Sequence, residues 1–289
     1  MDFALLLALA TLWGASYSFI RVGVETIPPV TLIAARTLIA TALLGAVMAA
    51  RRIALPRDAA TWRNFLFQAM LNSVVPFTLI AWGQQVVEAG LATILNSTAP
   101  IFTFLITWAF TGHEPVTGRK LLGVVAGLAG VTLIVGAQAL GGLGRELWSQ
   151  LAIVAATVCY AGAAIFGRNF SGLPPIVPAF GSMICGAAIL IPVSLALDRP
   201  WTLAPSSASL LALAGLSIFS TALAFLIYFR LLGTLGSVGT TAQAYLRVPI
   251  GVAIGALFLG ESLSATVWIG LACVVTGVAA MTIPAKIRS

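Results

Sequence analysis

Charged residues are scarce in this sequence. Aspartate, glutamate, lysine and arginine together make up 8% of the 289 residues, whereas apolar residues make up 60% and the mean hydropathy is +1.06. Soluble globular domains carry about 25% charged residues. The composition therefore excludes an ordinary soluble domain and predicts an integral membrane protein whose surroundings are the lipid bilayer.

Catalytic and metal-binding motifs are scarce as well. No G-x-x-x-x-G-K-[ST] loop occurs, since the run from Gly112 to Lys120 resembles one only superficially, so an ATP-driven pump is disfavoured. The single histidine, His113, precedes Glu114 but lacks the second histidine of H-E-x-x-H. Three cysteines inside apolar runs indicate neither a disulfide framework nor a zinc site. We therefore expect no enzyme activity, no cofactor and no metal.

The apolar residues fall into ten runs, each close to the roughly 20 residues that a helix needs to cross a bilayer. No connection between them is long enough to form a domain. This pattern predicts an all-α integral membrane protein with ten transmembrane helices. The predicted spans are 3–23, 30–50, 65–85, 89–110, 120–138, 149–168, 176–197, 208–229, 238–259 and 266–283.

The basic residues predict the orientation of these spans. With a cytoplasmic N-terminus, ten lysines and arginines fall in inner loops or the C-terminal tail and three fall in outer loops. Such a positive-inside bias places both termini in the cytoplasm. The net charge of +7 is thus explained by topology, and no nucleic-acid partner is expected. The remaining two of the fifteen basic residues, Arg36 and Arg247, lie inside predicted spans away from their ends.

The sequence is duplicated internally, with halves at 1–140 and 141–289. Residues recur in matching contexts 147 positions later, as in the pairs Glu114 and Glu261, Arg21 and Arg168, Gly123 and Gly270, and Gly130 and Gly277. Because each half holds five spans, an odd number, the second copy enters the membrane from the opposite side. Two five-helix repeats of inverted topology are typical of secondary transporters, which bind substrate near the bilayer midplane between the repeats.

Several motifs resemble those of one family. They are Trp13-Gly14-Ala15-Ser16-Tyr17 and Arg36-Thr37-Leu38, then Ala99-Pro100 and Gly112-His113-Glu114, and in the second half Pro249 and Leu259-Gly260-Glu261-Ser262. Over nearly the whole chain the sequence resembles EamA-type ten-helix members of the drug/metabolite transporter superfamily, and most of all the YddG-type bacterial amino-acid exporters. The resemblance implies a central cavity between the halves, alternating access, a location in the bacterial inner membrane, and a peripheral, structural role for the fifth and tenth spans.

Two predicted helix breaks occupy corresponding places in the two halves. A proline frees the backbone carbonyl four residues earlier, which here is that of Asn96 before Pro100 and that of Tyr245 before Pro249. Transporters bind substrates at such breaks. Simple kinks and hydrogen bonds between helices are the alternative. The substrate-binding residues predicted at the breaks are Asn96, Ser97, Pro100, Gln243, Tyr245, Arg247 and Pro249.

Arg247 lies about ten residues into its span, and no acidic residue lies inside any predicted span. Because intramembrane charges are rare and mark functional sites, Arg247 is a candidate to bind a substrate carboxylate in a bidentate fork. Bonds to freed backbone carbonyls are the alternative. Arg36 lies nearer its span end and is expected to snorkel toward water. The missing intramembrane carboxylate also removes the usual proton relay, which favours facilitated transport.

Further candidates are polar or aromatic residues in the first, third and sixth spans. Asn72 and Pro76 share one face of the third span at i, i+4, which suits a wet cavity as well as helix packing. Trp13 and Tyr17, with Tyr160 at the repeat offset from Trp13, could stack on an aromatic or cationic substrate. The alternative is that these rings pack between helices or sit in interfacial belts.

These features predict a secondary transporter, and the resemblance to YddG-type exporters implies that it exports aromatic and other neutral amino acids by alternating access around a central cavity. The alternatives are an exporter of drugs or other small amphipathic metabolites, possible proton coupling, and a channel. The sequence leaves open whether the protein is a monomer or a homodimer.

Overall fold

The structure, a computed structural model, describes residues 1–83, 86–87, 94–110, 117–135, 146–250 and 265–282. Within these ranges every regular element is a helix, so the predicted all-α class is confirmed for the described part of the chain. The sequence predictions made for His113, Glu114 and the segment 259–262 lie outside the described residues.

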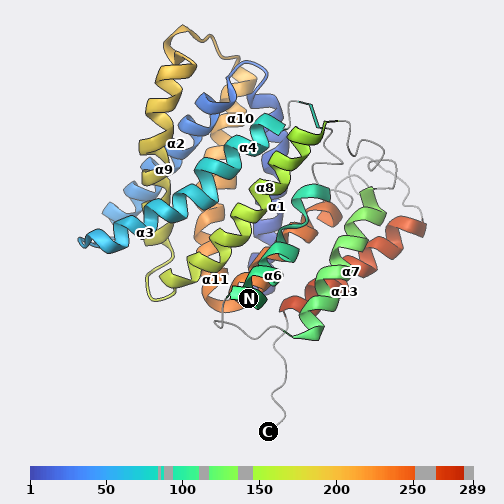
Figure 1. Ribbon diagram of the computed structural model, residues 1–289. Coiled ribbons are helices and arrows are strands. Elements are labelled where there is room, and N and C mark those ends of the chain that lie inside the picture. Colours follow the sequence, from blue (N-terminus) through green and yellow to red (C-terminus); the bar gives the residue numbers. More distant parts are fainter. Residues whose placement is uncertain (84–85, 88–93, 111–116, 136–145, 251–264, 283–289) are drawn as a thin grey trace.

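The described helices coincide with the predicted apolar runs (Figure 1). Six apolar runs in the described chain are long enough to cross a membrane, and two shorter apolar helices, Ile94–Ala109 and Trp268–Thr282, accompany them. The helices are α1 (Asp2–Gly23), α2 (Pro29–Ala50), α3 (Ala59–Ala69), α4 (Val75–Gly83), α6 (Ala99–Phe110), α7 (Gly118–Val135), α8 (Leu147–Gly167), α9 (Ile176–Leu197), α10 (Ser207–Ser217), α11 (Ala224–Thr241) and α13 (Ala265–Thr282).

Two of the predicted spans contain a π-helical turn. The turn η1 (Met70–Val74) joins α3 to α4, and η5 (Ile218–Leu223) joins α10 to α11. In the first, Pro76 follows the turn and lacks a backbone N–H, and the Val75 N–H bonds to the carbonyl of Met70, five residues earlier. Such turns are frequent at functional sites because they interrupt the regular ladder of helix hydrogen bonds.

The helix α11 consists of two helices that meet at Gly236. There the backbone has φ 73° and ψ −177°, a region that is essentially restricted to glycine. The chain therefore changes direction between the predicted eighth and ninth spans. The hydrophobic pattern alone would allow these two spans to form one long helix.

We expect Gly236→Ala to lower the free energy of unfolding by about 1–3 kcal/mol, because alanine is strained at this φ. The measurement is the melting temperature of the detergent-purified protein. Gly233→Ala is the matched control, because Gly233 lies in the same helix and a Cβ there would meet nothing within 4 Å. An equal loss of stability in both variants would contradict the assigned backbone at Gly236.

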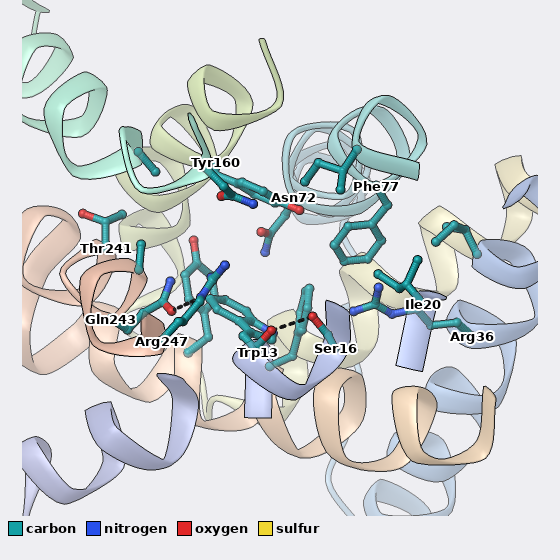
Figure 2. Close-up of a pocket in the computed structure, with 17 residues that line it drawn as sticks. Trp13, Ser16, Ile20, Arg36, Asn72, Phe77, Tyr160, Thr241, Gln243 and Arg247 are labelled. Carbon is teal, nitrogen blue, oxygen red and sulfur yellow. Dashed lines mark hydrogen bonds between the residues drawn. The ribbon is translucent and has the colours of Figure 1, made fainter. Parts of the chain in front are cut away.

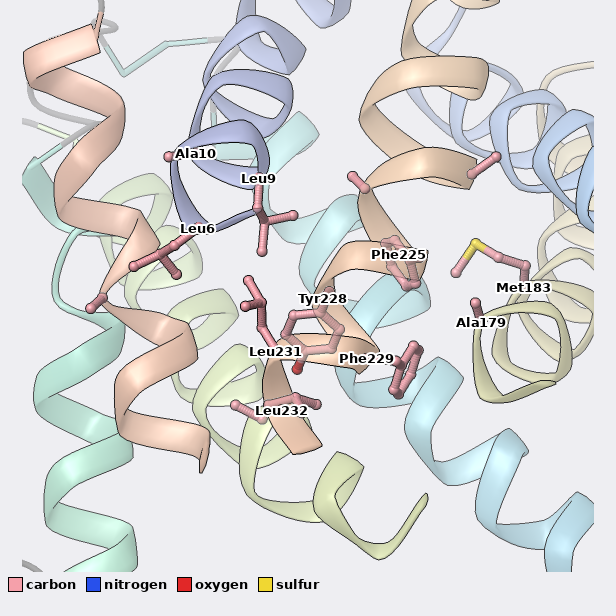
Figure 3. Close-up of a cluster of buried hydrophobic side chains, with 14 of the residues drawn as sticks. Leu6, Leu9, Ala10, Ala179, Met183, Phe225, Tyr228, Phe229, Leu231 and Leu232 are labelled. Atoms are coloured by element: carbon pink, nitrogen blue, oxygen red, sulfur yellow. The ribbon is translucent and has the colours of Figure 1, made fainter. Parts of the chain in front are cut away.

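The largest buried apolar cluster is arranged around α11 (Figure 3). Figure 3 shows its side chains meeting those of α1 on one side and of α9 on the other. The packing holds the middle of α11 inside the bundle, where its polar residues can face an internal site. The labelled members are Leu6, Leu9, Ala10, Ala179, Met183, Phe225, Tyr228, Phe229, Leu231 and Leu232.

The helices α7 and α13 lie side by side at the edge of the bundle (Figure 1). A Cβ atom at Gly123 would lie 2.6 Å from the carbonyl oxygen of Gly277, and one at Gly130 would lie 2.6 Å from that of Gly270. Small residues allow such close backbone approach in membranes. The glycines of these two helices therefore pack against each other within one chain.

Polar bonds join the segment that leads into the first turn of α2 to the segment that leads from the end of α9 into the first turn of α10. The carboxylate of Asp198 accepts hydrogen bonds from the backbone N–H of Thr31 at 2.9 Å and from its hydroxyl at 2.8 Å. The hydroxyl of Thr26 donates to that of Ser209 at 2.8 Å. These bonds tie the first half of the chain to the second at one end of the bundle.

Candidate functional site

A cavity lies between helices from both halves of the chain (Figure 2). The lining combines aromatic and aliphatic side chains with a few amides and two guanidinium groups. The described residues that line it are Trp13, Ser16, Ile20, Ile33, Arg36, Asn72, Phe77, Ile80, Asn96, Ala99, Tyr160, Phe225, Tyr228, Thr241, Gln243, Ala244 and Arg247.

Arg247 lies in the helical run 243–250, next to α1. Its Nε donates a hydrogen bond to Oε1 of Gln243 at 3.0 Å, and its Cζ lies 5.5 Å from the centre of the Trp13 ring. A Cβ at Gly14 would lie 3.7 Å from Cβ of Arg247, so α1 packs directly against the arginine at this position. The guanidinium is thereby oriented beside an aromatic face in the cavity wall.

Arg36 is buried, with 2% of its surface exposed, so the expectation that it snorkels toward water is wrong. Its Nε donates to the hydroxyl of Thr221 at 2.6 Å, and its Nη2 donates to the carbonyl of Ser220 at 3.3 Å. Its Cζ lies 4.0 Å from the centre of the Phe77 ring. The π turn η5 supplies both oxygen acceptors. These acceptors explain why the guanidinium lies buried beside η5 instead of reaching water at a helix end.

Asn72 lies in the π turn η1 and is 2% exposed. The described residues give its Nδ2 no hydrogen-bond partner. A buried amide without partners is unfavourable, so a group in the cavity is expected to accept from it. In Figure 2 this amide points into the central space.

Aromatic rings form two parts of the cavity wall. The Trp13 ring lies 5.4 Å from that of Tyr228 in a tilted arrangement and 6.2 Å from that of Phe225. Across the cavity, the rings of Phe77 and Tyr160 are 6.4 Å apart. Such walls bury the apolar part of a ligand and can stack on a flat one.

The structure brings together half of the predicted site residues. Tyr17 lies in α1, but its side chain is outside the described part. The predicted residues that line the cavity are Trp13, Asn72, Asn96, Tyr160, Gln243 and Arg247. Those absent from its described lining are Pro76, Ser97, Pro100, Tyr245 and Pro249.

Tyr245 is directed toward α7 and away from the cavity. It is 0% exposed, its ring contacts Gly127, and its hydroxyl donates to the carbonyl of Val124 at 2.9 Å. The hydrogen bond satisfies the buried hydroxyl. The side chain of Tyr245 therefore connects the cavity helix to α7 in a packing role, whereas the predicted substrate contact concerned its backbone carbonyl and stays a prediction.

The predicted helix breaks differ between the two halves. In the first, the helix is interrupted at 97–98, immediately before Ala99 and Pro100. In the second, the interruption falls at Ala242, and Pro249 lies inside the helical run 243–250. The polar residues Asn96 and Gln243 thus lie beside the two interruptions and face the cavity.

Sequence reasoning missed most of the apolar lining, including Phe77, Phe225 and Ile80. In a chain that is apolar on every side, an apolar residue facing a cavity cannot be distinguished from one facing lipid. Arg36 carried a usable signal, because its position seven residues into α2 is too deep for an ordinary interfacial arginine.

Comparison with known proteins places the chain among transporters. It is 27% identical to the uncharacterized inner membrane transporter YedA of Escherichia coli K12, covering 97% of this chain and 90% of that protein. It is 24% identical to an E. coli K12 protein named probable amino-acid metabolite efflux pump, covering 96% and 93%, and 27% identical to the probable terminal-alkyne amino-acid exporter of Streptantibioticus cattleyicolor, covering 89% and 85%.

A solved crystal structure shares the fold, with a TM-score of 0.77 at 19% identity over 97% of this chain and 95% of the other. The model of the EamA-like transporter family matches residues 3–136 and again residues 147–283. These two matches together cover most of the chain, and within them every regular element that the structure describes is a helix. The chain therefore belongs to the EamA-like transporter family of the drug/metabolite transporter superfamily.

Proposed function

We propose that this membrane transporter exports aromatic and other neutral amino acids across the bacterial inner membrane by facilitated, alternating-access transport. The observation that carries the proposal is the cavity in which the Arg247 guanidinium lies beside the Trp13 ring. A guanidinium can bind a carboxylate through two hydrogen bonds. The aromatic wall provides an apolar surface for a neutral side chain.

The relatives support this substrate class. Two of them, at 24% and 27% identity, bear names that include amino-acid export or efflux. At such identities the shared family indicates transport, whereas the substrate must follow from the residues of the site. The cavity residues of this chain therefore carry the proposal of amino acids.

The proposed architecture has ten spans in two inverted repeats, 1–140 and 141–289, with both termini in the cytoplasm. Contacts between α7 and α13 support it. Gly123 contacts Gly277, and the offset of 147 converts this pair into Gly270 and Gly130, which are also in contact. Such self-complementary contact is expected for two copies related by a two-fold axis. The π turns η1 and η5 also occupy nearly corresponding positions.

The proposed mechanism follows from the position of the cavity between the halves. Rocking of one half against the other would open the cavity alternately to each side of the membrane while Arg247 holds the carboxylate. The described lining contains no acidic side chain that could relay a proton. This favours transport down the substrate gradient without proton coupling.

Counterflow of labelled amino acids in proteoliposomes tests the function. We expect saturable exchange of leucine and phenylalanine that is unchanged by imposed pH or sodium gradients. Flux that depends on a pH gradient would contradict the facilitated mechanism, and non-saturable flux would indicate a channel. If amino acids are not exchanged by folded protein, the proposed substrate is wrong, and small amphipathic drugs or metabolites become the class to test.

Arg247→Ala is expected to reduce amino-acid exchange by tenfold or more, because a charge-assisted hydrogen bond contributes about 1.5–3 kcal/mol. The measurement is the initial rate of leucine counterflow, with the amount of folded protein determined by size-exclusion chromatography. Arg230→Ala, which removes an exposed arginine of α11, is the matched control and should retain the normal rate. Normal exchange by Arg247→Ala would remove this residue from the site.

A further inference from the structure

We propose that recognition by the cavity requires the carboxylate of a ligand but not its amino group. Therefore 2-oxo acids compete for the cavity at least as strongly as the corresponding amino acids. The recognition is assigned to Arg247 together with a donor subsite, defined as the side chains of Arg36 and Asn72. The inference rests on the proposed export function, whose substrate class it extends.

The first argument is the unpartnered amide of Asn72. Its Nδ2 is buried, no acceptor among the described residues meets it, and the side chain lines the cavity. A donor left without a partner in a low-dielectric site is unfavourable by itself and strengthens the binding of any acceptor that reaches it. The ligand is therefore expected to bring an oxygen to this position.

The second argument is the hydrogen bonding of Arg36. Its Nε and Nη2 are used by Thr221 and Ser220, whereas Nη1 has no hydrogen bond to the described residues. Phe77 covers one face of the guanidinium. In Figure 2 the guanidinium extends from below this ring toward the space that Asn72 faces. Arginine has donors only, so this part of the wall accepts an anionic or carbonyl oxygen.

The third argument is the charge of the lining. The described lining residues include two guanidinium groups, those of Arg36 and Arg247, and no aspartate, glutamate or histidine. A substrate ammonium would be repelled by both cations and would find no carboxylate on the described wall. The Trp13 ring, whose face could attract an ammonium group, already lies next to the Arg247 guanidinium. A carboxylate therefore contributes to binding, whereas the amino group of an amino acid does not.

The test uses three ligands with one carbon skeleton: leucine, its 2-oxo acid 4-methyl-2-oxopentanoate, and its decarboxylated amine 3-methylbutylamine. Each is added unlabelled in competition with labelled leucine counterflow. Each is also tested for thermal stabilisation of the purified protein in detergent. We expect the oxo acid to match or exceed leucine and the amine to be at least about tenfold weaker, the effect of one charge-assisted hydrogen bond.

Asn72→Asp supplies the matched variant, because it is nearly isosteric and places a carboxylate in the donor subsite. It should reverse the order, so that leucine competes more strongly than the oxo acid. Asn72→Leu removes the donor without adding charge, and should weaken the oxo acid by tenfold or more. If one variant does not fold, the other still tests the subsite.

The two proposals fail in different ways. Leucine exchange with an oxo acid that competes less strongly than leucine would overturn the donor subsite and leave amino-acid export intact. An unchanged ligand order in Asn72→Asp would also overturn it. Stabilisation of the protein by the oxo acid without any leucine exchange would support the subsite and remove amino acids as substrates.

Discussion

Arg36→Ala is expected to lower the free energy of unfolding by about 2–5 kcal/mol, the range for truncating a large buried side chain. The reason is that the substitution removes three contacts of the Arg36 side chain at once. The substitution empties the space beside the Phe77 ring, and it leaves the Ser220 carbonyl and the Thr221 hydroxyl without their donor. Release from the cost of burying a charge offsets part of this loss. The melting temperature in detergent measures the effect.

Arg36→Met separates stability from transport. Methionine fills the volume of the arginine stem and adapts to irregular space. Because replacement of a buried charge by an apolar side chain is often neutral, this variant should remain folded. Leucine counterflow should nevertheless fall at least tenfold, since the charged donors that Arg36 gives the subsite are gone. A folded methionine variant with normal flux would show that Arg36 is needed only for packing.

Gly123→Ala is expected to lower the free energy of unfolding by about 1–3 kcal/mol, the usual effect of overpacking. The added methyl group would lie 2.6 Å from the Gly277 carbonyl and 2.9 Å from Cγ of Met281. A backbone oxygen cannot turn aside as a flexible side chain can, so α7 and α13 must separate. Thermal unfolding followed by tryptophan fluorescence provides the measurement.

Gly277→Ala should have a similar effect, because its Cβ would lie 2.7 Å from the Gly123 carbonyl. Gly118→Ala is the matched control in α7, where a Cβ would meet nothing within 4 Å. Equal melting temperatures for Gly123→Ala and Gly118→Ala would mean that the close approach of α7 and α13 does not form. The comparison thus tests the contact on which the proposed repeat symmetry depends.

Much of the fold could be predicted because its determinants are local. Apolar runs of about 20 residues fix where helices can lie in a membrane, and the recurrence of residues after 147 positions predicts a duplication. The rarity of intramembrane charge drew attention to Arg247, and the structure places Arg247 on the cavity wall. Asn96 was predicted from its position four residues before Pro100, and Asn72 from the helix face that it shares with Pro76.

Tertiary structure alone decided the partners of these residues. Arg36 meets Thr221 across 185 positions, and Tyr245 meets Val124 across 121. No local pattern encodes such pairs, because they depend on how helices pack. Nor could the sequence distinguish the Phe77 ring in the cavity from the exposed Trp108, since lipid and protein interior are equally apolar surroundings. Hydrophobicity determined which segments are helices, and helix packing determined which of their faces enclose the cavity.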